Sequence, residues 1–303
     1  MGKENSKKEK KLWGYERSHI INGLLFCTPW ILGFLIFTAY PLVQTFIYSF
    51  NNVIIPPGGI EMSWAGISNF RTLFNDTTFS DAIEAYFLEL LLGVPVVIVF
   101  SLILAMVLNS TTKFKGILRS IFFLPVIITS GPVFAIFIEQ GVAQLPGVEE
   151  LFNFHTMAET MPLFAVNAIE MLTTQFIMLL WFSGIQILVF LTALQKIDSG
   201  MFEAASIDGA SKWAVFWKLI LPSLLPVIII NIIFTVVLMS TFPLNPIIQK
   251  IQSDMFDPEH GFGYAAAQSW IYTLTSLLML GLFLGMIMLI LGRKKKIKVK
   301  TYY

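Results

Sequence analysis

Six stretches of this sequence contain no Asp, Glu, Lys or Arg, and each is about long enough to cross a lipid bilayer as a helix. They are 20–60, 90–112, 120–138, 171–195, 219–249 and 260–292. A transmembrane helix needs roughly 20 consecutive apolar residues. In hydrocarbon every backbone amide and carbonyl must find a partner within the protein, and a helix satisfies them within one segment. The sequence therefore predicts an all-α membrane protein with six transmembrane helices.

Composition excludes a soluble enzyme and gives no sign of a nucleic-acid partner. The chain is 56% hydrophobic and only 13% charged, whereas soluble domains carry about 25% charged residues. Its net charge of +1 lacks the basic excess of a nucleic-acid-binding protein. Cys27 is the single cysteine, so no intramolecular disulfide can form and we expect a buried thiol. His19, His155 and His260 are scattered along the chain, and neither a metal site nor a cofactor is predicted.

The basic residues predict on which side of the membrane each loop lies. The N-terminal tail, the second and fourth loops and the C-terminal tail hold 18 of the 20 Lys and Arg residues, whereas the alternate loops hold only Arg71 and Lys250. Basic residues near the ends of spans stay in the cytoplasm, so both termini are predicted to be cytoplasmic. The acidic loop 140–162 has no basic residue, and it is expected to form an external helix or cap.

The predicted organisation is a cytoplasmic tail at 1–19, a six-helix domain at 20–292 and a basic cytoplasmic tail at 293–303. The first stretch is too long for a signal peptide and is expected to remain as a span. Prolines are expected to kink three helices, because each lacks an amide donor. The spans are placed at 21–49, 85–109, 116–138, 164–194, 224–246 and 267–292, and the prolines are Pro29, Pro41, Pro95, Pro125 and Pro132.

The fourth loop, residues 196–222, is predicted to form two short helices around Gly209. Asp198 or Ser199 can cap a first helix at 200–207, and Asp208 or Ser211 can cap the second. Glycine permits the sharp change of direction between them. Apolar residues recur at helical spacing in the second helix, which Pro222 is expected to end; they are Trp213, Phe216, Trp217 and Ile220. By periodicity alone, the loop could be a docking element or a helix pair that lies on the membrane surface.

The spacing of this loop favours docking. The loop contains Glu203-Ala204-Ala205, then Gly209 after three residues, then Leu219 to Pro222 after nine more. This pattern resembles the EAA loop of the permeases of ATP-binding-cassette importers, in which isoleucine usually replaces Leu219. Further segments are similar to the carbohydrate-uptake branch of that family; they are Thr28 to Phe34, Tyr40-Pro41, Trp181 to Gln186 and Phe190 to Gln195.

The resemblance implies a type I importer permease fold and a division of labour within the loop. Glu203 would contact a basic residue of a cytoplasmic ATPase, with Ala204 and Ala205 as a close-packed face. Gly209, next to Asp208, would form the bend. Leu221 and Pro222 would fix the exit into the fifth span.

The resemblance also implies the partners and the location. They are a second, homologous permease as a heterodimer, two ATPase subunits, an external solute-binding protein and the lipid of a bacterial plasma membrane. The sequence contains no phosphate-binding G-x-x-x-x-G-K-[ST] loop. A transport subunit that is not itself an enzyme is therefore predicted.

Polar residues within the spans are candidates for a solute path, because such residues usually face a cavity or another helix. Amides and hydroxyls could bind the hydroxyl groups of a sugar, and aromatic rings could cover its C–H faces. The alternative is hydrogen bonding that only holds the helices together. The candidates are Asn167, Glu170, Thr174, Trp181, Asn231, Thr235, Gln268 and Tyr272.

The function predicted on this basis is the import of a sugar or oligosaccharide delivered by an external binding protein. A polyol or glycerol phosphate remains an alternative cargo. An ion-coupled secondary carrier is a second alternative, which predicts charged residues in the middle of spans. None occurs in the middle of the first, third, fifth or sixth stretch.

Overall fold

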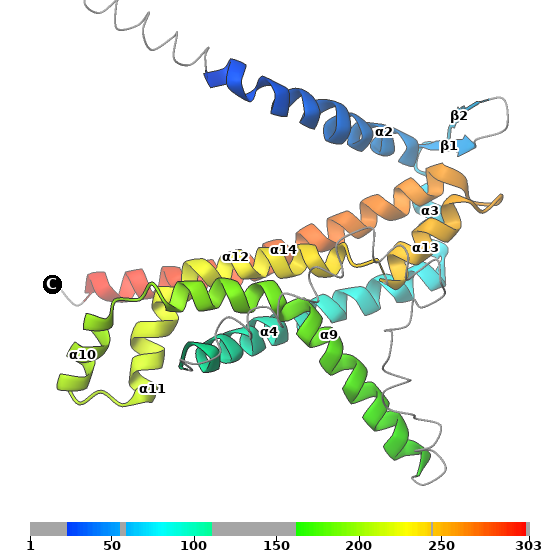
Figure 1. Cartoon of the computed structure of the whole chain (residues 1–303). Helices are drawn as coiled ribbons and strands as arrows, with labels where there is room; N and C mark the ends of the chain where they lie inside the picture. The colour runs from blue at the N-terminus through cyan, green and yellow to red at the C-terminus, as the bar shows by residue number, and fades with distance from the viewer. Residues whose placement is uncertain (1–22, 55–58, 111–161, 244, 301–303) are drawn as a thin grey trace, which may run out of the picture. The chain divides into compact units, whose positions relative to one another are not determined.

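The computed structural model describes residues 23–54, 59–110, 162–243 and 245–300, and the described part is almost entirely helical (Figure 1). The exception is a two-stranded antiparallel sheet. The chain divides into two compact units, Met1–Thr77 with Ile251–Ile271 and Thr78–Lys250 with Tyr272–Tyr303. Each unit has its own packing.

The described part of the first unit begins with an apolar helix, Gly23–Ser49, whose most apolar stretch contains no buried residue. Cys27 is exposed on this helix, so the expectation of a buried thiol is wrong. The helix widens into a π-helical turn, η1 (Leu35–Ala39), before α2 (Tyr40–Ser49). Pro41 lies at the start of α2. Its ring clashes with the carbonyl four residues earlier in a regular α-helix, which accounts for the widened turn.

A hairpin and a short helix follow in the first unit. They are β1 (Asn51–Ile54), β2 (Glu61–Trp64) and α3 (Ser68–Asn75), with Asn51 opposite Trp64 in the sheet. The buried amide of Asn69 donates to the backbone carbonyls of Ser49 and Asn51, each at 3.0 Å. One side chain of α3 thus fixes the junction between α2 and β1.

The start of α14 (Gly261–Lys300) lies against β1 at a glycine. A Cβ placed on Gly263 would collide with the backbone carbonyl of Asn51. Only glycine therefore permits this close approach of helix and strand.

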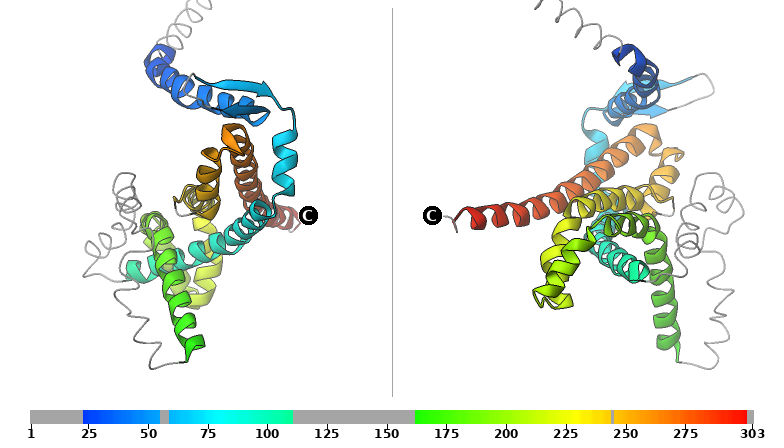
Figure 2. Two further views of the ribbon diagram at one scale, coloured as in Figure 1. Left: turned by 90° about the vertical axis from the view of Figure 1, so that its right-hand side faces the viewer. Right: turned by 60° about the vertical axis from the view of Figure 1, so that its left-hand side comes forward.

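The second unit is a helical bundle with a bent segment between α9 and α12 (Figures 1 and 2). Its helices are α4 (Thr77–Ser110), α9 (Leu163–Leu194), α10 (Ser199–Ile207), α11 (Lys212–Val215), η2 (Phe216–Ile220) and α12 (Leu221–Ser240). α13 (Pro246–Met255) and α14 run from one unit into the other. α12 packs chiefly on α9, and fully buried residues such as Ile187, Phe190 and Leu224 form the core.

Five of the predicted spans have counterparts among the described helices. Four helices are long and apolar enough to cross a membrane; they are Gly23–Ser49, Thr77–Ser110, Lys212–Ser240 and Gly261–Leu289. A fifth span is added if Met178–Leu194 and Ser199–Ile207, bent by 66°, count as one. The predicted span 116–138, with Pro125 and Pro132, lies outside the described residues, as does the predicted cap at 140–162.

The predicted end of the fifth span at 246 is wrong, because the helix stops at Ser240. Proline disfavours helical geometry in the residue before it, so Pro243 ends the helix early. The side chain of Asn245 then accepts from the amide of Ile247 at 3.0 Å, and Pro246 begins α13 as a separate helix.

Candidate coupling segment and polar interior

The coupling segment, residues 196–222, begins with a capped helix as predicted. Asp198 adopts an extended conformation, and its carboxylate accepts from the amide of Gly200 at 3.0 Å. Asp198 is therefore the cap, and Ser199 is the first residue of α10. This cap begins a new helix just beyond α9, and the two axes differ by 66°.

The turn after α10 requires glycine. Gly209 has φ +68°, a conformation that other residues rarely adopt. The amide of Ala210 donates to the carbonyl of Ala205 at 2.9 Å, which closes the helix by the usual left-handed C-terminal turn. Asp208 closes the end of α10 rather than capping the second helix. That cap is Ser211, whose hydroxyl accepts from the amide of Ala214 at 3.2 Å.

The second arm continues without a break into the fifth span. α11 leads into the π-helical turn η2, in which the amide of Leu221 donates to the carbonyl of Phe216. α12 starts at Leu221, with Pro222 in its first turn. The prediction that Pro222 ends the second helix is therefore wrong. A proline is tolerated where a π turn has already interrupted the regular hydrogen-bond ladder.

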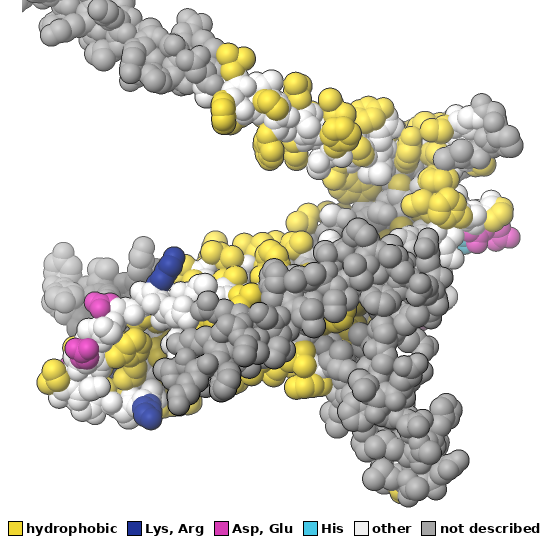
Figure 3. All heavy atoms as spheres, viewed as in Figure 1, with side chains coloured by type: hydrophobic (Ala, Val, Ile, Leu, Met, Phe, Trp, Pro, Cys, Tyr) yellow, Lys and Arg dark blue, Asp and Glu magenta, His cyan; other side chains and the backbone are white. Residues whose placement is uncertain are grey.

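The helices α10 and α11 form a hairpin (Figures 1 and 2), and the residues of the Glu-Ala-Ala sequence on α10 differ in exposure. Glu203 and Ala204 are exposed, whereas Ala205 is buried at 9% exposure. In Figure 3 acidic and basic side chains gather on this hairpin, while hydrophobic side chains cover the visible helices beside it. The hairpin therefore offers a small, acidic outer surface on α10.

A buried hydrogen-bond cluster joins α9 to α12. The amide of Gln186 donates to the hydroxyl of Thr235 at 2.9 Å, and that hydroxyl donates to the carbonyl of Asn231 at 2.7 Å. The Asn231 amide points back to the carbonyl of Gln186 at 3.5 Å. All three side chains are 0% exposed. Their position supports the interhelical alternative for Asn231 and Thr235.

Three buried polar atoms of α9 and α12 have no hydrogen-bond partner among the described residues. They are Oε1 of Gln186, Oδ1 of Asn231 and Nε1 of Trp181. Trp181 packs edge-on against Phe242 with ring centroids 6.4 Å apart. Unsatisfied buried polar atoms are costly, so this part of the bundle is suited to take up water or a polar group.

A second polar cluster joins α4, α12 and α14. The hydroxyl of Tyr86 lies 2.6 Å from that of Ser240 and 2.7 Å from that of Ser276. Tyr272 donates to the carbonyl of Ser240 at 2.6 Å and accepts from the amide of Asn245 at 3.3 Å. The rings of Tyr86 and Tyr272 are 4.6 Å apart. Tyr272 thus lies where three helices meet.

Gln268 lies in the first unit, on the same helix as Tyr272 but with different hydrogen-bond partners. Its buried amide donates to the carboxylate of Asp254 at 2.6 Å. In the same unit the hydroxyl of Tyr264 donates to Asp76 at 3.0 Å. These bonds tie the start of α14 to α13 and to the end of α3.

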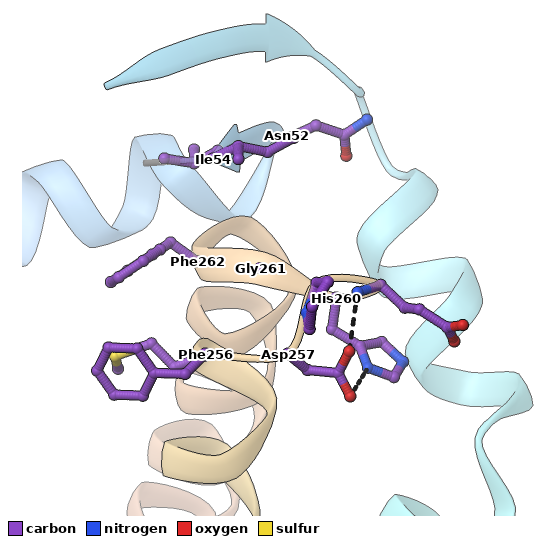
Figure 4. Close-up of a pocket in the computed structure, with 11 residues that line it drawn as sticks. Asn52, Ile54, Phe256, Asp257, His260, Gly261 and Phe262 are labelled. Carbon is purple, nitrogen blue, oxygen red and sulfur yellow. Dashed lines mark hydrogen bonds and ion pairs between the residues drawn. The ribbon is translucent and has the colours of Figure 1, made fainter. Parts of the chain in front are cut away.

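The first unit also contains an open pocket of about 360 Å³ between β1 and the loop that joins α13 to α14. Figure 4 shows Asp257 in this loop accepting from the amide of Glu259, with His260 beside it. The His260 ring is 3.6 Å from the Asp257 carboxylate, and Phe256 and Phe262 lie together on one side, with ring centroids 5.9 Å apart. Acidic and aromatic side chains thus share one loop.

The structure therefore groups the predicted path residues only in part. Asn231 and Thr235 share one cluster near Trp181, Tyr272 belongs to a second and Gln268 to the other unit. Asn167, Glu170 and Thr174 lie on α9, but their side chains are outside the described residues. Sequence reasoning missed the partners Tyr86, Ser240 and Asp254, since a single polar residue in or beside an apolar helix gives no spacing to recognise.

Long apolar helices with buried polar clusters, joined by a bent polar hairpin, define a multi-pass membrane protein. The family described as "Binding-protein-dependent transport system inner membrane component" matches residues 64–296. The chain belongs to this family of membrane transport subunits, which confirms the resemblance to importer permeases.

Individual relatives agree with this assignment. The chain is 30% identical to the probable ABC transporter permease protein YesP of Bacillus subtilis, over 84% of this chain and 86% of that protein. It is 35% identical to the arabinooligosaccharides transport system permease protein AraP of the same species, over 67% and 64%. A solved bacterial ABC transporter involved in the import of alginate has the same fold, with a TM-score of 0.56 and 19% identity over 91% of this chain and 98% of that one.

Proposed function

We propose that this permease forms, with a second permease, the path by which an ATP-driven importer carries a sugar or oligosaccharide into a bacterial cell. Relatives at 30–35% identity include proteins named for arabinooligosaccharides, lactose and multiple sugars. Relatives named for glycerol 3-phosphate and for osmoprotective compounds are 25% identical. A carbohydrate is therefore the preferred cargo, and a polyol or glycerol phosphate is the alternative.

The geometry of the coupling segment is the observation that carries this proposal. Glu203 and Ala204 are exposed on α10, and Gly209 turns the chain back toward the fifth span. A carboxylate on a small-residue surface suits a cleft that carries a basic side chain. Ala205 stabilises the hairpin from within, so the contact assigned to both alanines is here assigned to Ala204 alone.

The continuous helix from α11 to α12 supports a mechanical role for this contact. A force on the hairpin would pass into the fifth span through Leu221 and Pro222, because no loop separates them. The sequence has no phosphate-binding loop of its own. Two cytoplasmic ATPase subunits are therefore proposed as the source of the force.

An external solute-binding protein is proposed as the supplier of the cargo. The family is described by its dependence on binding proteins. A related solved alginate transporter was crystallised with an alginate-pentasaccharide-bound periplasmic protein. The distribution of 18 basic residues against two supports six spans in the plasma membrane, with residues 1–19, 196–222 and 293–303 in the cytoplasm.

The solute path is proposed to run beside the unsatisfied polar atoms between α9 and α12. Gln186, Asn231 and Trp181 offer two acceptors and one donor there. Asn167, Glu170 and Thr174 precede them on α9, whereas Thr235 joins α12 to α9 beside the proposed path. Hydroxyl groups of a sugar both donate and accept, so they can satisfy all three atoms.

Uptake by cells with and without this gene tests the proposal. Deleting the gene should abolish the uptake of a labelled arabinooligosaccharide or of lactose, and the wild-type gene should restore it; loss of glycerol 3-phosphate uptake alone would favour the alternative cargo. Glu203→Gln should restore membrane insertion but little uptake, because it removes the proposed ionic contact. Uptake that collapses with the proton gradient at constant ATP would support a secondary carrier instead.

A further inference from the structure

The helical segment that contains the fifth span has more residues than are needed to cross the hydrocarbon core of a bilayer. Lys212–Ser240 contains 29 residues, and its first part, α11, turns away from the axis of α12 (Figure 1). The hydrocarbon core is only about 30 Å thick, and the 20 residues of α12 are enough to cross it. The preceding residues, 212–220, are therefore not needed to cross the hydrocarbon core. This stretch is called the aromatic arm.

The aromatic arm carries exposed indole rings. Trp213 is 72% and Trp217 48% exposed. Their ring centroids are 5.5 Å apart, and Phe216 packs edge-on against Trp217 at 5.2 Å. Tryptophan side chains concentrate at the membrane–water interface, because one end of the ring is apolar and the other carries an N–H group. The cluster is therefore suited to the headgroup region.

The two arms of the hairpin differ in charge. The aromatic arm carries Lys212 and Lys218, both exposed, and no acidic residue. The α10 arm and its ends carry Asp198, Glu203 and Asp208 and no basic residue. An anionic surface would thus attract one arm and repel the other.

We propose that the aromatic arm binds the headgroups of anionic phospholipids, with Lys212 and Lys218 on the phosphates and Trp213 and Trp217 between the lipids. The acidic α10 arm stands away from the membrane and stays free for another protein. The bilayer surface then acts as the fixed point about which the hairpin moves. This proposal depends on the proposed function in two respects only. The arm is assigned to the cytoplasmic leaflet, and the protein that binds the α10 arm is taken to be the ATPase.

Quenching of tryptophan fluorescence by brominated lipid tests this inference on the purified full-length chain, without ATPase or transport. The chain is placed in bilayer nanodiscs in which either phosphatidylglycerol or phosphatidylcholine is brominated near the headgroup, at equal total composition. Brominated phosphatidylglycerol should quench more. Each lysine near an anionic surface is expected to enrich such lipids about fivefold. The Trp213→Phe/Trp217→Phe variant should lose most of the difference between the lipids, which assigns it to the aromatic arm.

Charge-neutral variants test whether the preference for phosphatidylglycerol belongs to the aromatic arm or to the whole loop. Lys212→Gln/Lys218→Gln should remove the preference for phosphatidylglycerol, whereas Lys196→Gln, at the other end of the segment, should keep it. Circular dichroism checks that all variants remain helical. Equal quenching by both lipids in the wild type would overturn the inference, as would an equal loss of preference in Lys196→Gln. Absence of a lipid preference would not contradict the proposed sugar import. Absence of sugar uptake would likewise not contradict lipid binding by the aromatic arm.

Discussion

Gly209 and Gly263 are both needed, but for different physical reasons. Gly209 has open space around its Cα and is required by its positive φ, whereas Gly263 has an ordinary φ and is required by the nearby carbonyl of Asn51. The sequence predicted the first, because a glycine between two capped helices indicates a turn. It did not predict the second, since a close contact with a strand more than 200 residues earlier leaves no local pattern.

Gly209→Ala should lower uptake while leaving the permease in the membrane. A side chain in the left-handed conformation costs about 1 kcal/mol, which favours rotation of α10 away from its present direction. Gly200→Ala is the matched control, because Gly200 lies in α10, the helix that Gly209 follows, and an added Cβ there makes only ordinary contacts. Transport assays and membrane immunoblots of both variants measure the effect, and equal uptake in the two would contradict the proposed bend.

Gly263→Ala should destabilise the protein by about 1–3 kcal/mol, because the methyl group forces α14 and β1 apart. Gly281→Ala lies in the same helix with nothing within 4 Å of the added methyl, and it should be neutral or slightly stabilising. Thermal unfolding in detergent compares the two variants. Equal melting temperatures would show that β1 is not held against α14.

Tyr272→Phe separates a path role from a packing role. It removes the hydroxyl that donates to Ser240, so a loss of about 1 kcal/mol in stability is expected in either case. Tyr86→Phe is the control, since its hydroxyl contacts the same helix but was not a path candidate. If Tyr272 lines the path, its variant alone should also raise the KM for uptake at equal amounts of assembled protein. Equal effects of both variants would assign Tyr272 to packing.

At the scale of secondary structure, the caps of the coupling segment followed from the sequence and the π turn did not. Asp198 and Ser211 were among the predicted caps, because short oxygen-bearing side chains at helix starts are a local signal. Phe216–Ile220 reads as ordinary α-helix in the sequence. Its geometry depends on which hydrogen bonds survive next to Pro222, and periodicity does not reveal that.

Pro222→Ala should convert η2 toward regular α-helix, because the new amide can donate to the carbonyl four residues earlier. Loss of the extra residue in the turn would rotate the hairpin relative to α12, so uptake should fall although the helix becomes more stable. Pro226→Ala, one turn further along α12, is the control and should keep uptake. Uptake and melting temperature are measured together, and full uptake by Pro222→Ala would contradict a role for the π turn.

At the scale of the whole molecule, thiol labelling in a Cys27→Ser background tests which segments face the cytoplasm. A membrane-impermeant thiol reagent should label Glu259→Cys in intact cells, whereas it should label Ser206→Cys only after permeabilisation. Both residues are exposed, so access depends on the side of the membrane. Labelling of Ser206→Cys in intact cells would overturn the proposed topology and the coupling role of Glu203.

The sequence by itself determined the membrane class, the approximate position of five described spans and the bent hairpin between the fourth and fifth. These features depend on local physics, namely charge-free length, capping side chains and one glycine. Tertiary structure alone decided that Ala204 is exposed and Ala205 buried, and that Asn231 and Thr235 meet Gln186. It also placed Tyr272 beside Tyr86. In apolar helices that are hydrophobic on every side, no periodicity marks the face that meets a neighbour, so only packing assigns each polar side chain its partner.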